Sequence, residues 1–485
     1  MTETESQTET RPAGGGPGVA LTTLTAMVVG SMVGAGVFSL PRRFATETAI
    51  PGALIAWLIA GTGMLMLAFV FQTLAVRKPD LDSGVYAYAK AGFGEYLGFF
   101  SGFGYWASAC VGNVTYWVLI GSTVGAVVPA LGEGDTLLSV GLSSIGVWAF
   151  AFLILRGVRE ATTINTIVTV AKVIPILVFV LLALFALDVD VFVDNLTAGP
   201  QLGGLFDQVQ GTMLATVFVF LGVEGASVYS RLARRRTDVG RATILGFVSV
   251  LAVFASVTIV SYGILPRAEL AELRQPSMAG VLEAAVGSWG AVFVSVGLIV
   301  SVLGAYLAWT LMAAEVLFVA AQDDDMPRFL RRENRAQAPV AALLMTTVLI
   351  QVMLLVALVS DNAFDFMLNM TSALTLIPFL LAAAYALKLV LSRETYTGEA
   401  AGGRTRDLAV AVLATLYTAF LLFAAGPKYM LVSFIIYAPG SVLFVMARRE
   451  QGRKPFSPTE LVILAVSVIG AVIGVVALVA GWITV

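Results

Sequence analysis

The chain consists mainly of long apolar runs separated by short polar connections. Only 12% of its 485 residues are charged, and its mean hydropathy is +0.91, whereas about a quarter of a soluble domain is charged. A helix needs about 20 apolar residues to cross a bilayer. We therefore predict an all-α integral membrane protein with about thirteen transmembrane helices, at 19–41, 51–76, 95–129, 136–156, 161–187, 209–232, 241–265, 287–321, 338–359, 363–391, 406–426, 428–447 and 459–484.

The Lys and Arg residues favour one side of these predicted helices. If the N-terminus is cytoplasmic, 23 of the 29 Lys and Arg residues lie on cytoplasmic segments and five outside, with Lys172 inside a span. Short cytoplasmic loops of membrane proteins carry such an excess. We expect a multi-pass plasma-membrane protein with a cytoplasmic N-terminus, whose basic clusters anchor helix ends and bind no nucleic acid.

Several catalytic chemistries lack their residue types in this chain. It has no histidine, and its only cysteine is Cys110. A Ser-His-Asp triad and a thiolate metal cluster are therefore excluded, and the commonest zinc ligand is missing. We expect a protein that is not an enzyme and that uses no cofactor and no metal.

Glycines interrupt the first predicted span in the stretch "GSMVGAGVFSLP", residues 30–41. Each glycine weakens a helix by about 1 kcal/mol relative to alanine. The sixth span contains a matching interruption at 216–230, "TVFVFLGVEGASVYS". Two broken spans, five apart, are typical of transporters with an inverted repeat and a mid-membrane binding site. In the first span alone, Gly30 and Gly34 also fit a helix-packing motif.

The interrupted spans offer backbone groups to a substrate. The N–H groups of Gly34, Ala35 and Gly36 would begin an outer half-helix, where the helix dipole favours a carboxylate. The carbonyl groups of residues 30–33 and 218–221 would suit an ammonium group. Together they predict a site for the head group of an α-amino acid.

Lys172 and Glu224 are the ionisable residues nearest the middle of predicted spans. A charge there costs about 2.5–3.5 kcal/mol on insertion scales, so each is expected to face a cavity or a partner. Lys172 would replace a sodium ion, carry a proton or bridge backbone carbonyls. Glu224 would contact a cationic substrate or hold the break in the sixth span together.

Aromatic and uncharged polar side chains complete the predicted site. The face of Trp309 would attract a desolvated guanidinium or ammonium group by about 2 kcal/mol; packing against other helices is its alternative role. Tyr105, Tyr116 and Phe218 are further aromatic candidates. Asn113 and Thr371 offer hydrogen bonds at the same depth.

Four segments resemble the amino acid–polyamine–organocation superfamily: "GSMVGAGVFSLP", "FLGVEGASVYS", "AWTLMAAEVLFVAAQDDDMPRFL" and "TLIPFLLAAAYAL". Within it, "GYWASACVGNVTYW" and "LRGVREATTINTIVTVAKVIP" look like the arginine/ornithine branch of the basic amino acid/polyamine antiporters. The resemblance implies a LeuT-like five-plus-five inverted repeat with discontinuous helices 1 and 6. The corresponding domains are a disordered tail at 1–18, repeats at 19–187 and 209–391, and accessory helices at 406–485.

The resemblance also implies roles for individual residues. Ala35 and Gly36 correspond to carboxylate-binding positions, and Trp309 to an aromatic residue that lines the side-chain site. Two departures from the arginine/agmatine branch, Ala35 for a hydroxyl residue and Phe218 for a tryptophan, argue for a different substrate pair or a different binding pose. The predicted substrate-binding residues are Val33, Gly34, Ala35, Gly36, Ala109, Asn113, Phe218, Leu221, Glu224, Trp309 and Thr371, with Tyr105 and Phe218 as gating residues and Lys172 and Glu224 at the ion-site position.

The expected function is exchange of arginine for ornithine by alternating access. Each substrate carries one net positive charge, so one-for-one exchange moves no net charge. A proton-coupled amino-acid permease is the alternative, and a transport-inactive sensor or a channel lacks sequence support. The expected partners are amino-acid substrates and membrane lipid, with a homodimer as a further possibility. The thirteenth span is one more than the superfamily's usual twelve.

Overall fold

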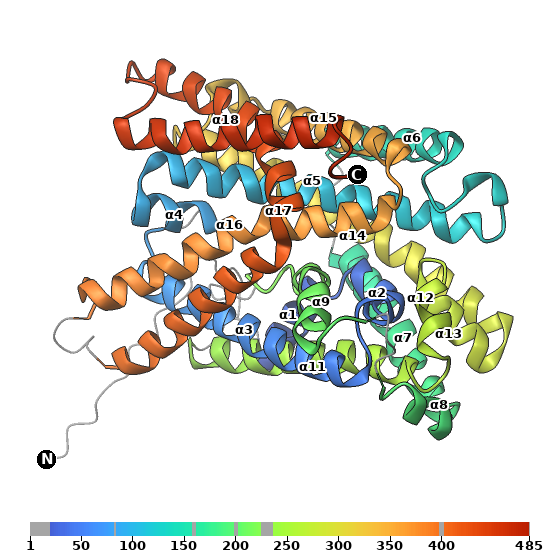
Figure 1. Cartoon of the computed structure of the whole chain (residues 1–485). Helices are drawn as coiled ribbons and strands as arrows, with labels where there is room; N and C mark the ends of the chain where they lie inside the picture. The colour runs from blue at the N-terminus through green and yellow to red at the C-terminus, as the bar shows by residue number, and fades with distance from the viewer. Residues whose placement is uncertain are drawn as a thin grey trace, which may run out of the picture.

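The computed structural model is all-helical, and its long helices run roughly side by side (Figure 1). It describes residues 20–81, 84–157, 162–197, 202–224, 236–396 and 402–484. The elements are α1 Leu21–Met32, η1 Ala35–Ser39, α2 Leu40–Glu47, α3 Ile50–Arg77, α4 Val85–Phe93, α5 Glu95–Gly125, η2 Pro129–Leu131, α6 Leu137–Leu155, α7 Thr162–Phe185, α8 Val189–Asp194, α9 Leu205–Val219, α11 Arg236–Ser261, α12 Arg267–Glu272, α13 Ser277–Val286, α14 Ser288–Gln322, η4 Arg328–Arg331, α15 Val340–Val356, η5 Ala357–Val359, α16 Ala363–Ser392, α17 Arg404–Glu450 and α18 Pro458–Val479.

Nine helices in the described part of the chain are long and apolar enough to cross a membrane, or ten if the bent pair at the N-terminus is one span. The prediction of an all-α membrane protein is therefore confirmed. The two predicted spans 406–426 and 428–447 are the arms of α17, which bends at Gly426, where φ is 70°. The predicted tail 1–18 lies outside the described residues.

The break predicted in the first span is present. The α1 helix ends at Met32, and the segment Ala35–Glu47 continues at an angle of 53° to it. Gly34 connects them in an extended conformation, with φ −121° and ψ −160°. Pro41 stands in the first turn of α2, where a missing N–H removes no helical hydrogen bond.

In the described part of the sixth span the helix ends where its glycines predict, whereas residues 225–232 of that span lie outside the described residues. The α9 helix ends at Val219, and the chain turns through Gly222, whose φ is 100°. Only glycine adopts this conformation readily. A Cβ atom at Gly222 would also lie 2.2 Å from the carbonyl oxygen of Ser31. The break therefore depends on a residue without a side chain.

Burial separates the central helices from the peripheral ones. In the most apolar part of α5, 83% of the residues are buried, compared with 22% in α18. The exposed side chains of α18 are apolar, among them Leu461, Val466 and Ile473. We infer that α5 lies inside the bundle and that α18 faces lipid, which agrees with the position of α18 at its margin in Figure 1.

The bundle has two distinct ends. Figure 1 places α4 near one end and α8, α12 and α13 at the other; we call these the α4 end and the α13 end. The segment 77–98 contains α4, which packs against α5 and α16. The segment 265–287 contains α12 and α13. The α2 helix packs against α12 and α13, so its residues Arg42 and Arg43 lie at the α13 end.

Candidate functional site

The two broken spans meet at their breaks. The Ser31 hydroxyl donates a hydrogen bond to the Gly222 carbonyl oxygen at 3.1 Å. Beyond the break, Gly36 packs so closely on α9 that a Cβ atom there would lie 2.7 Å from side-chain atoms of Phe218 and Val219. Small residues on both segments therefore allow the two backbones to approach each other in the interior of the bundle.

A small cavity lies where the breaks meet. Its free volume is about 20 Å³, enough for roughly one water molecule. Sites for small molecules usually measure about 300–1,000 Å³, so the cavity must widen to hold an amino acid. The residues that line it are Ser31, Met32, Gly34, Ala35, Gly36, Ser108, Ala109, Gly112, Tyr116, Phe218, Val219, Leu221, Trp309 and Thr371.

Three residues with backbone donors at the break, Gly34, Ala35 and Gly36, line this cavity. The N–H groups at the start of a helix have no acceptor within that helix. Among the described residues, no backbone carbonyl outside η1 accepts from Gly34, Ala35 or Gly36. A carboxylate placed here would accept these bonds and interact with the positive end of the segment.

Eight of the eleven predicted substrate-binding residues line the cavity, and three do not. The eight are Gly34, Ala35, Gly36, Ala109, Phe218, Leu221, Trp309 and Thr371. Val33, Asn113 and Glu224 lie outside the lining. So do Tyr105 and Lys172; Lys172 is buried on α7.

Glu224 stabilises the break in the sixth span. Its Oε1 atom accepts a hydrogen bond from the Tyr105 hydroxyl at 2.5 Å, and its Oε2 atom accepts from the Gly222 N–H at 3.1 Å. The carboxylate thus joins the turn after α9 to α5. This geometry favours the structural role over direct substrate contact.

Asn113 stands beside the site, on α5. Its side-chain amide donates to the Thr310 hydroxyl at 3.1 Å. Its Oδ1 atom is buried and accepts no hydrogen bond in the described part of the chain. A buried acceptor of this kind is unfavourable unless it is satisfied. Asn113 therefore links α5 to α14 behind Trp309 and keeps one acceptor available.

The eleven predicted substrate-binding residues omitted six that line the cavity, although three of the six lie in the ranges 30–33 and 218–221, whose carbonyls were predicted to bind an ammonium group. The six are Ser31, Met32, Ser108, Gly112, Tyr116 and Val219. On α5, residues 108, 112 and 116 follow one another at intervals of four, which places them on one helix face with Ala109. This spacing could have identified them once Ala109 was assigned to the site. Tyr116 was considered only as a further aromatic candidate.

No charged side chain lines the cavity in the described residues. A cationic group placed there would meet the indole of Trp309 and the hydroxyl groups of Ser31, Ser108 and Tyr116. Tryptophan is the side chain whose face attracts cations most strongly. The lining can therefore hold a cation without a buried counter-ion.

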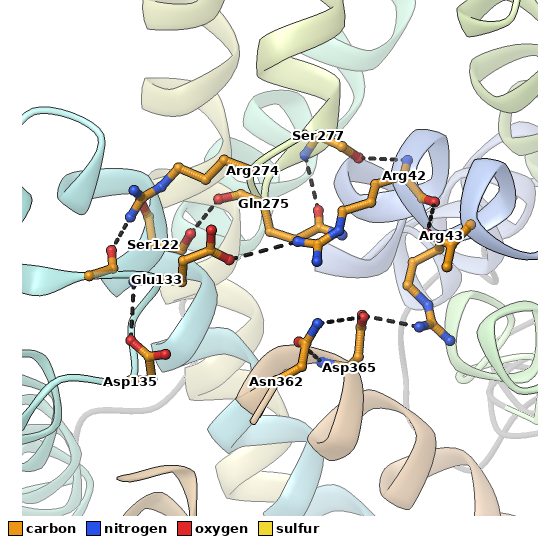
Figure 2. A network of polar contacts seen from close by, with 12 residues as sticks. Arg42, Arg43, Ser122, Glu133, Asp135, Arg274, Gln275, Ser277, Asn362 and Asp365 are labelled. Atoms are coloured by element: carbon orange, nitrogen blue, oxygen red, sulfur yellow. Dashed lines mark hydrogen bonds and ion pairs between the residues drawn. The ribbon is translucent and has the colours of Figure 1, made fainter. Parts of the chain in front are cut away.

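Polar networks close the bundle on both sides of the cavity. At the α13 end, Arg42 pairs with Glu133 at 3.7 Å and Arg43 with Asp365 at 3.2 Å, as Figure 2 shows. Ser122 and Arg274 extend this network between α5 and the segment before α13.

At the α4 end, a second network joins α4 to the end of α14. The Lys90 ammonium group contacts both carboxylate oxygens of Asp325 at 2.7 Å. The Tyr86 hydroxyl donates to the same carboxylate at 2.5 Å. The two networks thus join helices at opposite ends of the bundle.

Comparison with known proteins places the whole chain among transporters. A family model described as amino acid permease matches residues 20–447. An arginine/ornithine antiporter of Pseudomonas aeruginosa is 48% identical over 95% of this chain and 97% of that protein. An L-lysine transport protein of Corynebacterium glutamicum is 41% identical over 96% and 95%. An arginine/ornithine antiporter of Latilactobacillus sakei is 37% identical over 98% and 99%.

Proposed function

The chain belongs to the amino acid permease family, as its resemblance to the amino acid–polyamine–organocation superfamily predicts, and we propose that it exchanges arginine for ornithine across the plasma membrane. The observation that carries this proposal is the 48% identity to an arginine/ornithine antiporter over nearly the full length of both chains. The cavity between two broken spans supports it, because such breaks bind substrates in secondary transporters.

The cavity suggests how the substrate would be held. The N–H groups of Gly34, Ala35 and Gly36 would bind the carboxylate. Backbone carbonyls near Phe218 and the Ser31 hydroxyl would accept from the α-ammonium group. The side-chain cation would lie against Trp309.

The arrangement in the membrane is part of the proposal. Residues 19–187 and 209–391 would form the two inverted repeats, and the 406–485 segment the accessory helices of a thirteen-span chain. With the N-terminus in the cytoplasm, the α13 end faces outward. A homodimer and a membrane-lipid environment complete this picture.

The charge distribution at the α13 end supports a cationic substrate. The segments that would face outward carry five basic residues against twelve acidic ones. Such a surface raises the local concentration of cations and their association rate. The acidic residues are Glu47, Glu133, Asp135, Asp188, Asp190, Asp194, Asp207, Glu269, Glu272, Glu283, Asp361 and Asp365.

Counterflow into proteoliposomes tests the proposal. Uptake of labelled arginine is expected when the lumen contains ornithine and is expected to be absent when the lumen is empty. Glycine in the lumen is the control for osmolarity. Accumulation of arginine in empty vesicles under an imposed proton gradient would contradict obligatory exchange and favour the proton-coupled permease.

Lysine is the second candidate substrate, because an L-lysine transport protein is 41% identical to the chain. Lysine placed in the lumen of the same vesicles, in place of ornithine, tests whether lysine also exchanges for arginine. If luminal lysine supports arginine uptake as fast as luminal ornithine does, the pocket recognises the side-chain ammonium group and does not discriminate by side-chain length. If labelled lysine exchanges for luminal lysine but labelled arginine does not exchange for luminal ornithine, the arginine/ornithine assignment is wrong.

A further inference from the structure

We propose that Asp365 and Asn369 form a second binding site for the side-chain cation of the substrate, which Arg43 occupies in this structure. We call it the outer cation site. It rests on the proposed transport of cationic amino acids with the α13 end outward.

The structure already contains a guanidinium group in this site. Arg43 is only 6% exposed. Its Nη1 atom lies 3.2 Å from Asp365 Oδ1, and its Nη2 atom donates to Asn369 Oδ1 at 3.0 Å. A substrate arginine has the same chemical group. The contacts of Arg43 therefore indicate which groups a free guanidinium would meet there.

The site is organised independently of Arg43. The Asn362 side chain donates to Asp365 Oδ2 at 2.9 Å, as Figure 2 shows. The Asn369 amide donates to the Tyr429 hydroxyl at 2.9 Å, which turns its Oδ1 atom toward the guanidinium. Both acceptors are thus fixed by α16 and by its neighbour α17, and not by α2.

Arg43 satisfies this site incompletely. Its Nε atom is buried and donates to no acceptor among the described residues, and Asp365 Oδ1 lacks a well-directed hydrogen bond over the same part of the chain. A guanidinium and a carboxylate prefer two parallel hydrogen bonds. A free arginine side chain is not tethered to α2, and it can adopt this bidentate arrangement.

The outer cation site and the central cavity lie on the same two segments. Asp365 precedes the cavity residue Thr371 by six positions on α16, about 9 Å at 1.5 Å per residue. Arg43 follows the cavity residue Gly36 by seven positions. A substrate that leaves the outer site toward the interior therefore reaches the cavity within about two helical turns.

Arg43 and a cationic substrate side chain can each occupy this site, so outward opening depends on the charge of the substrate. Movement of α2 away from α16 separates Arg43 from Asp365 and leaves a partly buried carboxylate without its cation, which is unfavourable. An amino acid with a cationic side chain replaces the lost partner, whereas a neutral amino acid does not. Asp365 thus selects for cationic substrates before they reach Trp309.

Opposite changes in the external KM test this proposal. In intact cells of a host without its own arginine uptake, Asp365→Asn removes the site and is expected to raise the KM for external arginine about tenfold. Arg43→Gln removes the competing occupant and is expected to lower that KM about threefold. A simple ion-pair gate predicts instead that both variants shift the KM in the same direction, and this result would overturn the proposal.

Two further variants keep the test decisive. Asn369→Ala keeps the ion pair, removes one acceptor and is expected to raise the KM about threefold even if Asp365→Asn does not fold. Asp361→Asn is the matched control, because Asp361 is exposed just before α16 and makes no ion pair with Arg43. Asp361→Asn is expected to change the KM less than twofold. If it raised the KM as much as Asp365→Asn does, the effect would come from the general surface charge and the specific site would be contradicted.

Citrulline, which has a neutral ureido group in place of the guanidinium, measures selectivity directly. The ratio of citrulline to arginine concentrations that half-inhibit uptake is expected to fall about tenfold in Asp365→Asn. If the wild type exchanges arginine for ornithine and the ratio in Asp365→Asn equals that of the wild type, the outer cation site is contradicted. The proposed function is not affected by that result. Failure of the wild type to exchange arginine for ornithine contradicts the proposed function, and the KM comparison is then made with lysine.

Discussion

At the scale of single residues, we expect Trp309 to contribute most to substrate recognition. It is the largest aromatic side chain in the cavity lining, where no charged side chain is found among the described residues. Loss of a desolvated cation–π contact costs about 2 kcal/mol, which is about thirtyfold in affinity. Trp309→Ala is expected to weaken arginine binding by that factor in a titration of the purified protein. Trp309→Phe should retain part of the affinity, and unchanged binding in the alanine variant would remove this role.

Tyr116 provides a smaller test of the same cavity. Its hydroxyl lies 3.7 Å from the position of a Cβ atom on Gly34, beside the proposed carboxylate-binding N–H groups. A hydrogen bond to substrate contributes about 1 kcal/mol, so Tyr116→Phe is expected to raise the Kd for arginine about fivefold. The measurement is direct binding, with Tyr262→Phe as a control at the α13 end. Wild-type affinity in Tyr116→Phe would place the hydroxyl outside the site.

At the scale of elements, the contact between η1 and α9 depends on Gly36. A Cβ atom there would lie 2.7 Å from Phe218 and Val219, so Gly36→Ala must push the two broken spans apart. Overpacking of this kind costs about 1–3 kcal/mol. We expect arginine exchange to fall at least tenfold, measured in proteoliposomes with equal amounts of protein.

Gly141→Ala is the matched control for Gly36→Ala. Gly141 lies on α6, and no atom lies within 4 Å of the position of its Cβ atom. Alanine also favours a helix over glycine by about 1 kcal/mol, so this variant is expected to be at least as stable as the wild type. Equal activity of the two variants would show that the η1–α9 contact is not required.

Two carboxylates attach the α4 helix to the end of α14: Asp325 accepts from Lys90 and Tyr86, and Asp323 accepts from Tyr86 at 3.1 Å. Burial and the hydrogen bond to Asp325 raise the pKa of Tyr86 above its ordinary value, so this hydroxyl remains a donor at physiological pH. Asp325→Ala removes the acceptor of Lys90 and the closer of the two acceptors of Tyr86, which keeps Asp323. Hydrogen bonds to charged groups contribute about 1.5–3 kcal/mol each. We expect Asp325→Ala to lower the Tm of the protein in detergent, whereas Asp80→Ala is expected to leave the Tm unchanged. Equal Tm values for Asp325→Ala and the wild type would show that this attachment does not stabilise the protein.

At the scale of the whole molecule, the absence of net charge movement is the main prediction. Arginine and ornithine each carry one positive charge, so their exchange is expected to be independent of membrane potential. Potentials of opposite sign, set with a potassium ionophore in proteoliposomes, should leave the initial rate within about 20%. A current during exchange on a supported membrane would show that another ion moves with the substrates.

Much of the architecture was predictable from the sequence. The apolar runs predicted an all-helical membrane protein, because a long segment without charges can satisfy its backbone in lipid only as a helix. The glycines at 34 and 222 predicted both breaks, because glycine weakens a helix and because Gly222 takes a positive φ that only glycine adopts readily. Of the eight predicted binding residues that line the cavity, five lie on or beside those breaks, and Ala109, Trp309 and Thr371 lie on α5, α14 and α16.

The tertiary structure alone decided which polar side chains meet. Glu224 was a candidate for substrate contact, but its carboxylate accepts from Tyr105 on α5 and from the Gly222 N–H. Likewise, Arg43 and Asp365 are 322 positions apart, and no local pattern pairs them. Hydropathy and glycine spacing depend on neighbours along the chain, whereas an ion pair depends on how helices distant in sequence pack. The sequence therefore determined where the chain crosses the membrane and where it breaks, and packing determined which charges hold it closed.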